Sequence, residues 1–345
     1  MPRRTFLPMR FIHVAAAILL SSVVAVAQLK PLTSLEQAGG EVTCIDFSAD
    51  GRFFFSGSLD SYITVWSTTN WAKAEEIPPA PPPISPAGEH QAEFRGLAAC
   101  AVVPNGDSVL IASGDDSLAT YSLQDRHQYT DRNLNVNYRA LAVSADGQEV
   151  AVGNGTELVL YSLSEWRKVG TVALRGSVGT VRYAPTGRLL AAAIERGGVQ
   201  LWDTRKKALV RTLSDTGNSG QIRFSPDGRL VAVAVWGAGH RTGVKVWNVS
   251  TGQQVAWLTA TNLRLKHKND VWAVAFSPDG TSLISGDTNG NVVVWSTANW
   301  QSCYQLTTAG LYELAVSPDG RWLASGGGDT DAFIWDLQQL TKNCH

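Results

Sequence analysis

A phrase that recurs seven times along the 345-residue chain predicts an all-β fold. In each copy a short apolar strand runs into a glycine turn, a second strand follows, and a third strand ends on an aromatic residue. The turn glycines are Gly51, Gly106, Gly147, Gly187, Gly228, Gly280 and Gly320. The closing aromatic residues are Trp66, Tyr121, Tyr161, Trp202, Trp247, Trp295 and Trp335. Because these positions recur every 40 to 55 residues and each copy carries several strands, the pattern is typical of β-propeller blades.

The best copies, at residues 47–66, 276–295 and 316–336, resemble the WD40 family, as in the segment FSPDGTSLISGDTNGNVVVW. The other four copies match less closely, and together the resemblance covers nearly everything after residue 28. It implies a seven-bladed propeller of four-stranded antiparallel blades, which we take as one domain over residues 28–345. It implies little about activity, because one fold hosts many unrelated functions.

The copies depart from the family pattern in one respect. The Gly-His pair that opens fuller repeats is missing, and an aspartate stands six residues before the closing aromatic residue only at Asp60, Asp115 and Asp329. Blade six has Asn289 at that place. We therefore expect the internal Asp-His-Ser-Trp hydrogen-bond relay of the family to be absent, so that packing and turn chemistry hold the blades.

Within each unit, apolar and small residues alternate with a period of two, and Val, Ile, Leu and aromatic residues predominate, which predicts strands. The Asp-Gly and Thr-Gly pairs supply the positive φ of tight hairpin turns. A fourth, outer strand is predicted over residues 72–77, 168–174, 208–213, 254–259 and 302–306. No unit buries both of its faces alone, so stacked neighbours supply the core.

The ring also needs closure. The seventh unit ends near Asp336 without an outer strand of its own, and residues 30–35 precede the first unit without a unit of their own. Members of the WD40 family commonly let an N-terminal strand complete the last blade. We predict that residues 32–35 pair with the strand that ends at Trp335, which would remove free sheet edges.

The first 27 residues are predicted to be an export signal outside the fold. Three arginines precede an apolar run over residues 14–26, and Ala25-Val26-Ala27 is a cleavage site of small residues. The alternative is an uncleaved membrane anchor, although the run is short for a span. The start also resembles a twin-arginine signal, beside the general secretory signal. We expect export to the periplasm or the extracellular space, with no membrane span after cleavage.

The charge balance excludes an electrostatic footprint for nucleic acid. The formal net charge is −1, and removal of the signal, with three arginines and no acidic residue, takes it to −4. Only 17% of residues are charged. We therefore expect no nucleic-acid partner and a monomeric protein.

Four cysteines in an exported protein allow up to two disulfides, in three connectivities. Cys44 and Cys100 lie on predicted inner strands, where small buried thiols are common. Cys303 and Cys344 lie at the periphery of neighbouring units. The bridge we single out is therefore Cys303–Cys344, which would pin the C-terminus.

The chain carries no sequence motif for catalysis. It has no HExxH, no CxxC, no G-x-S-x-G and no phosphate-binding glycine loop, and its histidines are not spaced as metal pairs. We therefore predict no catalytic, metal-binding or cofactor-binding residue, and no cofactor. A site of converging side chains in the central channel leaves no local motif. Candidates on predicted inner strands, which are otherwise ordinary channel-wall residues, are Asp46, Arg139, Arg182, Arg223 and Glu313.

The longest excursions between strands share one predicted face of the ring. They cover residues 78–94, with the run PPAPPPISP, and residues 234–244 and 259–270. The last two should be neighbours and form a basic, aromatic patch, with solvated loops as the blander interpretation. Trp and Arg are enriched among interface hot spots. The predicted partner-binding residues are Trp236, His240, Arg241, Arg264, Lys266, His267 and Lys268.

The sequence as a whole predicts an exported, non-catalytic binding platform. Its expected partner is a protein or peptide that docks on the loop-bearing face of a rigid propeller. One alternative is a periplasmic or secreted propeller hydrolase or lyase with its site in the central channel. Another is a member of an envelope assembly that has no ligand of its own.

Overall fold

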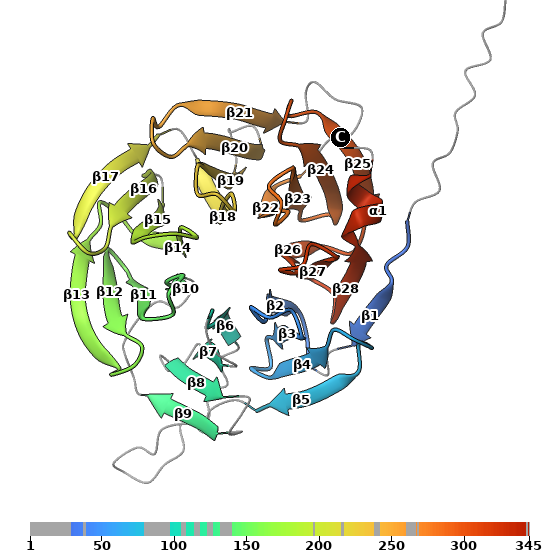
Figure 1. The fold of residues 1–345 in the computed structure, drawn as a ribbon, viewed down its shortest axis with the longest axis horizontal. Helices are drawn as coiled ribbons and strands as arrows, with labels where there is room; N and C mark the ends of the chain where they lie inside the picture. Colours follow the sequence, from blue (N-terminus) through green and yellow to red (C-terminus); the bar gives the residue numbers. More distant parts are fainter. Residues whose placement is uncertain are drawn as a thin grey trace, which may run out of the picture.

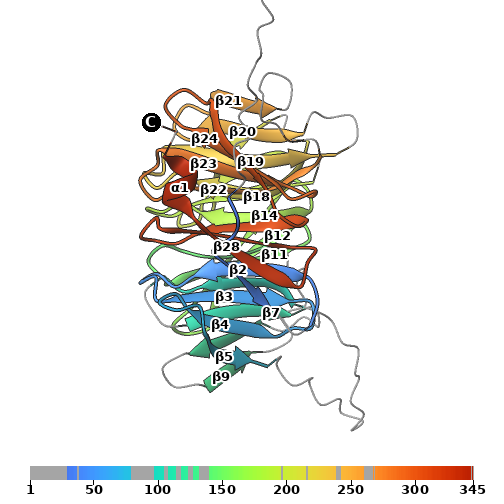
Figure 2. The ribbon, with the colours of Figure 1, turned by 90° about the vertical axis from the view of Figure 1, so that its right-hand side faces the viewer.

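The computed structural model is a ring of seven four-stranded antiparallel sheets (Figure 1). It describes residues 29–36, 39–78, 97–104, 108–113, 118–122, 127–131, 140–195, 197–214, 217–237, 242–259, 267, 269–342 and 344. Each sheet is one blade, and the strands β2, β6, β10, β14, β18, β22 and β26 line the centre of the ring. Figure 2 shows the ring from its side, where it forms a disc and the strands run from one face of the disc to the other. The seven-bladed, all-β propeller predicted from the repeats is confirmed.

The strands follow the repeats in chain order. Blades one and two contain β2 (Val42–Phe47), β3 (Phe53–Ser58), β4 (Ile63–Ser67), β5 (Lys73–Ile77), β6 (Leu97–Val102), β7 (Ser108–Ser113), β8 (Leu118–Ser122) and β9 (His127–Asp131). Blades three and four contain β10 (Leu141–Val143), β11 (Glu149–Asn154), β12 (Glu157–Ser162), β13 (Arg167–Ala173), β14 (Val178–Tyr183), β15 (Leu189–Ile194), β16 (Gly198–Asp203) and β17 (Ala208–Leu213). Blades five and six contain β18 (Asn218–Phe224), β19 (Leu230–Trp236), β20 (Gly243–Asn248), β21 (Gln254–Thr259), β22 (Val271–Phe276), β23 (Ser282–Asp287), β24 (Asn291–Ser296) and β25 (Ser302–Thr307). Blade seven contains β26 (Leu311–Val316), β27 (Trp322–Gly327), β28 (Asp331–Asp336) and β1 (Thr33–Glu36).

The Asp-Gly turns between the first and second strands are stabilised by local hydrogen bonds to the aspartate. In blade five, Ser225 Oγ donates to Asp227 Oδ1 at 2.6 Å, and the Arg229 amide donates to the same oxygen at 3.0 Å. The Ser225 hydrogen bond, followed by that from the Arg229 amide, lowers the pKa of the Asp227 carboxyl. Gly228 takes a φ of +70°, which a side chain would strain. This end of the ring is the turn face, and the opposite end, where chain segments lead into each blade, is the loop face.

The N-terminal strand closes the ring as predicted. Strand β1 pairs antiparallel with β28, with Thr33 opposite Ile334 and Leu35 opposite Ala332. The Leu32 amide extends the ladder by donating to the Ile334 carbonyl at 2.7 Å. Leu35 is 3% exposed and belongs to the core shared by blades seven and one. Blade seven therefore joins the two ends of the described chain.

The core lies between neighbouring blades. One cluster joins Val244 and Val246 of blade five to Val274, Leu283 and Trp295 of blade six. Each blade thus buries its face against the next, as stacked repeats require.

One helix was not predicted. Helix α1 (Leu337–Thr341) follows β28, and its N-cap Asp336 accepts from the Gln339 amide. Leu337 and Leu340 are buried against blades six and seven. Within the described residues, no helix has the length and apolarity needed to cross a membrane.

All four cysteines are joined in disulfides. Cys303 of β25 is bonded to Cys344, with Cα atoms 5.2 Å apart. Cys44 of β2 is bonded to Cys100 of β6, with Cα atoms 5.9 Å apart. Our interpretation of Cys44 and Cys100 as buried thiols is therefore wrong. These residues lie on the inner strands of adjacent blades, which stand side by side only in the closed ring.

Candidate binding surface and channel

Two of the predicted partner-binding residues, Trp236 and His267, lie among the described residues. The other five lie outside them, so the structure leaves the predicted basic patch as a prediction: His240, Arg241, Arg264, Lys266 and Lys268. The two described residues have different environments. Trp236 lies at the loop face, whereas His267 is buried inside blade six.

Trp236 belongs to a row of three aromatic side chains along the loop face. It is the last residue of β19, and its ring stacks on that of Trp272, with centroids 4.8 Å apart and planes at 17°. The Trp272 ring contacts Tyr312 edge-on, with centroids 6.0 Å apart. Trp272 and Tyr312 are each the second residue of an inner strand, so the row runs from blade five across blade six to blade seven. All three side chains are half-buried.

The aromatic row also holds an unsatisfied donor. Trp236 Nε1 is buried and has no hydrogen-bond acceptor in the described part of the chain. The sequence identified Trp236 through its loop but missed Trp272 and Tyr312. Both stand at strand positions that look like ordinary half-buried aromatic residues.

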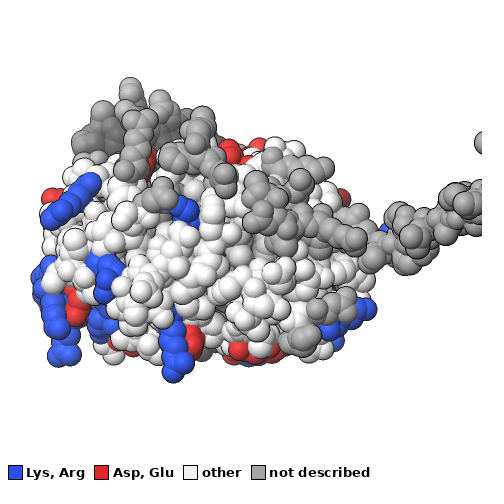
Figure 3. All heavy atoms as spheres, turned by 90° about the horizontal axis from the view of Figure 1, so that it is seen from above, with Lys and Arg blue, Asp and Glu red and all other residues white. Residues whose placement is uncertain are grey.

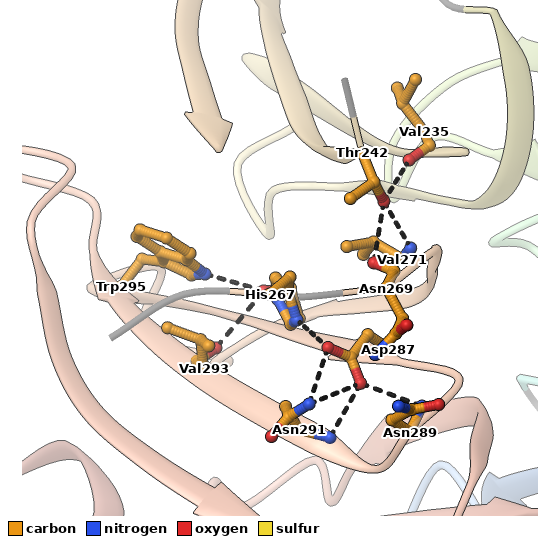
Figure 4. A network of polar contacts seen from close by, with 11 residues as sticks. Val235, Thr242, His267, Asn269, Val271, Asp287, Asn289, Asn291, Val293 and Trp295 are labelled. Atoms are coloured by element: carbon orange, nitrogen blue, oxygen red, sulfur yellow. Dashed lines mark hydrogen bonds and ion pairs between the residues drawn. The ribbon is translucent and has the colours of Figure 1, made fainter. Parts of the chain in front are cut away.

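His267 is not a surface residue, contrary to our prediction. Its side chain is 1% exposed and lies inside blade six, as Figure 4 shows. His267 Nδ1 lies 3.2 Å from Asp287 Oδ2, and Nε2 lies 2.7 Å from Ser285 Oγ. Trp295 Nε1 donates to the same hydroxyl at 2.7 Å. The side chain is therefore a structural part of the blade and is withdrawn from the partner-binding set.

The Asp-His-Ser-Trp relay is present in blade six, so the expectation that the chain lacks it is wrong there. The acid is Asp287, eight residues before Trp295, where the sequence pattern had pointed to Asn289. The carboxylate also accepts from the Asn289 amide at 3.0 Å and the Asn291 amide at 2.9 Å. Burial raises the pKa of Asp287, but hydrogen bonds from His267 and Asn291 outweigh burial and hold the pKa below its ordinary value. An acid displaced by two residues along the turn thus completes the same network.

Shorter versions of the relay occur in two other blades. Trp66 Nε1 donates to Ser56 Oγ at 2.7 Å in blade one. Trp335 Nε1 donates to Ser325 Oγ at 3.3 Å in blade seven. Neither serine is seen to contact a histidine in the described residues.

One level of the central channel carries only charged residues and alanines. Three inner strands carry a charged residue as their penultimate residue: Asp46, Arg182 and Arg223. The other four inner strands carry alanine there: Ala101, Ala142, Ala275 and Ala315. We call this ring of positions the charged level; it lies toward the turn face, away from the aromatic row. Of the five channel candidates from the sequence, Arg139 lies outside the described residues.

Glu313 connects the charged level to blade seven. Arg223 Nη2 lies 3.9 Å from Glu313 Oε2, and Gln221 Nε2 donates to the same oxygen. Gln221 and Arg223 belong to blade five, so they reach past the small side chains of blade six to meet Glu313. Burial raises the pKa of Glu313 to about 7 against the opposing influence of Arg223 and Arg182. Burial, and then the charge of Arg182, lowers the pKa of Arg223 to about 9.

The channel cluster is where the alternative function, a channel enzyme, would place its chemistry. It contains the Glu313 carboxylate and the Arg182 and Arg223 guanidinium groups, whose charges influence one another. Among the described residues, no group of three or more His, Cys, Asp or Glu side chains is arranged to hold a metal ion.

Basic side chains gather on one part of the rim. Figure 3 shows Lys and Arg concentrated toward its left side, which corresponds to blades three and four in Figure 1. The exposed residues there include Arg167, Lys168, Arg205, Lys206 and Lys207. Arg167 and Lys206 pair with Glu165 and Asp203, at 3.0 and 3.7 Å. The sequence analysis missed this basic rim because its residues come from different strands and turns.

Comparison with known families finds one match. The family described as "WD domain, G-beta repeat" matches residues 29–67, 260–296 and 300–336. These segments include the first three strands of blade one and all the strands of blades six and seven, which are the blades with the best copies of the repeat.

Relatives are similar over about half of the chain. A p21-activated protein kinase-interacting protein 1-like protein of Danio rerio is 24% identical over 171 residues, which cover 50% of this chain and 42% of the relative. The uncharacterized WD repeat-containing protein sll1491 of Synechocystis is 25% identical, over 49% of this chain and 50% of its own length. A Protein LST8 homolog of Drosophila melanogaster is 26% identical, over 50% of this chain and 55% of its own length. The chain thus spans about half the length of the curated relatives it matches.

Proposed function

We propose that this chain, a WD40-repeat β-propeller of seven blades, is an exported platform that binds a protein or peptide partner on its loop face. WD40 propellers typically act as scaffolds for protein interactions. The relatives agree with a role of this kind, since one of them is named for its interaction with a protein kinase. The specific face and the export belong to our proposal.

The observation that carries the proposal is the aromatic row of Trp236, Trp272 and Tyr312. Large aromatic side chains contribute much contact area at a small cost in conformational entropy, and Trp and Tyr dominate interface hot spots. The three rings already contact one another, so a partner would meet a preformed surface.

The predicted basic residues are close in sequence to the aromatic row. Residues 238–241 and 260–266, which lie outside the described structure, hold four of the predicted basic and histidine side chains. Clustered Arg and Lys near an aromatic centre would steer an acidic partner. The double charge reversal Arg241→Glu with Lys268→Glu tests that contribution.

Export is supported by the cysteines. Both disulfides join residues far apart in the chain, by 56 and 41 positions, and no described cysteine is free. Disulfides of this kind persist in oxidising compartments such as the periplasm and the extracellular space. Fractionation of the host, with thiol labelling before and after reduction, tests the proposal. Recovery of the chain in the cytoplasm with reactive thiols would refute it.

The binding proposal is tested in two steps. Affinity capture from host extract identifies a partner, and binding of that purified partner is then measured with variants. We expect Trp272→Ala to weaken binding by at least about 30-fold, the loss typical of a hot-spot residue. The matched control is Trp300→Ala, because Trp300 is also half-buried but follows β24 at the turn face. Equal affinities of the wild type and Trp272→Ala, with both folded, would move the site away from the aromatic row.

A further inference from the structure

We propose that the charged level of the channel binds a small anionic ligand, a carboxylate or a phosphate, through Arg182 with Arg223 beside it. This site lies toward the turn face, whereas the aromatic row lies at the loop face. It is therefore independent of the proposed partner surface, and the two can be tested separately.

The charge of Arg182 opposes the burial that raises the pKa of Glu313, but Arg182 forms no ion pair with a described residue. Its Nε is buried and has no hydrogen-bond acceptor. No hydrogen bond or ion pair joins its guanidinium to any described residue. A buried N–H without an acceptor destabilises a protein by about 1–3 kcal/mol, and more for a charged group. An anion that accepts from Arg182 would remove that cost.

The nearby carboxylates are already engaged. Glu313 accepts from Gln221 and pairs with Arg223 at 3.9 Å. Asp46 Oδ1 accepts from the Phe47 amide at 2.9 Å. Arg182 and Arg223 come from the adjacent inner strands β14 and β18, and their charges influence each other. Two guanidinium groups on adjacent inner strands favour an added negative charge.

Solvent reaches the charged side chains of this level, while its alanines are buried in the cores between blades. The side chain of Arg223 is 20% exposed and that of Glu313 is 26% exposed, so solvent reaches the cluster from the channel. A small ion is therefore able to approach, while the ring of inner strands excludes a large ligand.

The chemistry of the guanidinium group identifies the ligand class. Its planar array of N–H donors matches two oxygens of a carboxylate or a phosphate and binds them more strongly than a neutral donor does. Glu313 and Asp46 border the site and would disfavour a highly charged ion. A monovalent or divalent anion is therefore the expected ligand.

Isothermal titration calorimetry with the purified chain tests the proposal, using sodium acetate and inorganic phosphate as separate probes in a chloride-free buffer. We expect saturable binding of at least one probe, and the probe that binds distinguishes a carboxylate site from a phosphate site. Arg182→Gln should weaken this binding at least tenfold. The matched control, Arg205→Gln, removes an exposed cation of the basic rim and should leave binding unchanged.

Two results would overturn the proposal. One is the absence of saturable binding of either anion to the wild-type chain. The other is equal binding by the wild type and Arg182→Gln. If Arg182→Gln does not fold, as judged by circular dichroism, Arg182→Lys replaces it. Lysine keeps the charge and most of the apolar stem but loses the fork of donors, so binding should still weaken, and unchanged affinity would contradict the assignment.

Discussion

The buried relay of blade six leads to a quantitative prediction for Asp287→Ala. The Asp287 carboxylate accepts from His267 Nδ1, from the amides of Asn289 and Asn291, and from Asn291 Nδ2. Asp287 is fully buried and His267 is 1% exposed. The variant therefore leaves an imidazole nitrogen inside the blade that water does not readily reach.

The magnitude follows from these contacts. The amides of Asn289 and Asn291 lie near the surface, where water can replace the lost acceptor. The bonds from His267 and the Asn291 side chain have less access to water, and each is worth about 1.5–3 kcal/mol because one partner is charged. We expect Asp287→Ala to lower the free energy of unfolding by about 3 kcal/mol.

Equilibrium unfolding in urea, followed by tryptophan fluorescence and circular dichroism, measures the effect. The control is Asp60→Ala in blade one, where the acid accepts from Ser58 Oγ and from the Tyr62 amide but contacts no described histidine. Asp60 is partly exposed, so its loss should cost only about 1 kcal/mol. A loss for Asp287→Ala no larger than that for Asp60→Ala would refute the energetic role of the relay.

The pH dependence gives a second check on the same variant. Because the folded state lowers the pKa of Asp287, its carboxylate stabilises the fold above the pKa of the unfolded chain. That contribution disappears as the pH falls through the lower, folded value. The difference between the wild type and Asp287→Ala should therefore be full at neutral pH and shrink below about pH 4.

Two further predictions concern the disulfides and the channel. Loss of the Cys303–Cys344 bridge, by replacing both residues with serine, should lower the free energy of unfolding by up to about 4 kcal/mol for a 41-residue separation, and an unchanged melting temperature would contradict this. In the channel, Glu313 has its pKa raised from an ordinary 4.5 to about 7, so the folded state holds the proton more tightly than the unfolded state. As the pH rises from 4.5 to 7, the free energy of unfolding of the wild type should therefore fall relative to that of Glu313→Gln, by at most about 3 kcal/mol. A difference in urea midpoints between the two proteins that stays constant over this pH range would argue against the shift.

Much of the fold follows from local sequence. The alternation of apolar residues and the positive φ of the turn glycines act over a few residues, so the repeats indicate the strands and the number of blades. Outer strands β17 and β21 have the predicted bounds. Pairing of Leu35 with β28 was also predictable, because one blade lacked a strand and one segment lacked a blade.

The candidate sites were predictable only in part. Sequence alternation placed Asp46, Arg182, Arg223 and Glu313 on inner strands, but it did not indicate that Glu313 pairs with a residue two blades away. That pairing depends on the radius of the ring and on the alanines between the partners. The aromatic row has the same origin, because Trp236 and Trp272 meet only where blade five packs on blade six.

The sequence by itself determined the blade count, the strand order and the closure of this protein, since these depend on periodicity and turn chemistry within each repeat. The tertiary structure alone decided that Cys44 bonds to Cys100, that His267 is buried beside Asp287, and that Arg182 Nε has no acceptor among the described residues. The physical reason is that such contacts, between blades and inside blade six, depend on packing distance and side-chain direction in the closed ring. A pattern within a single repeat carries no record of either.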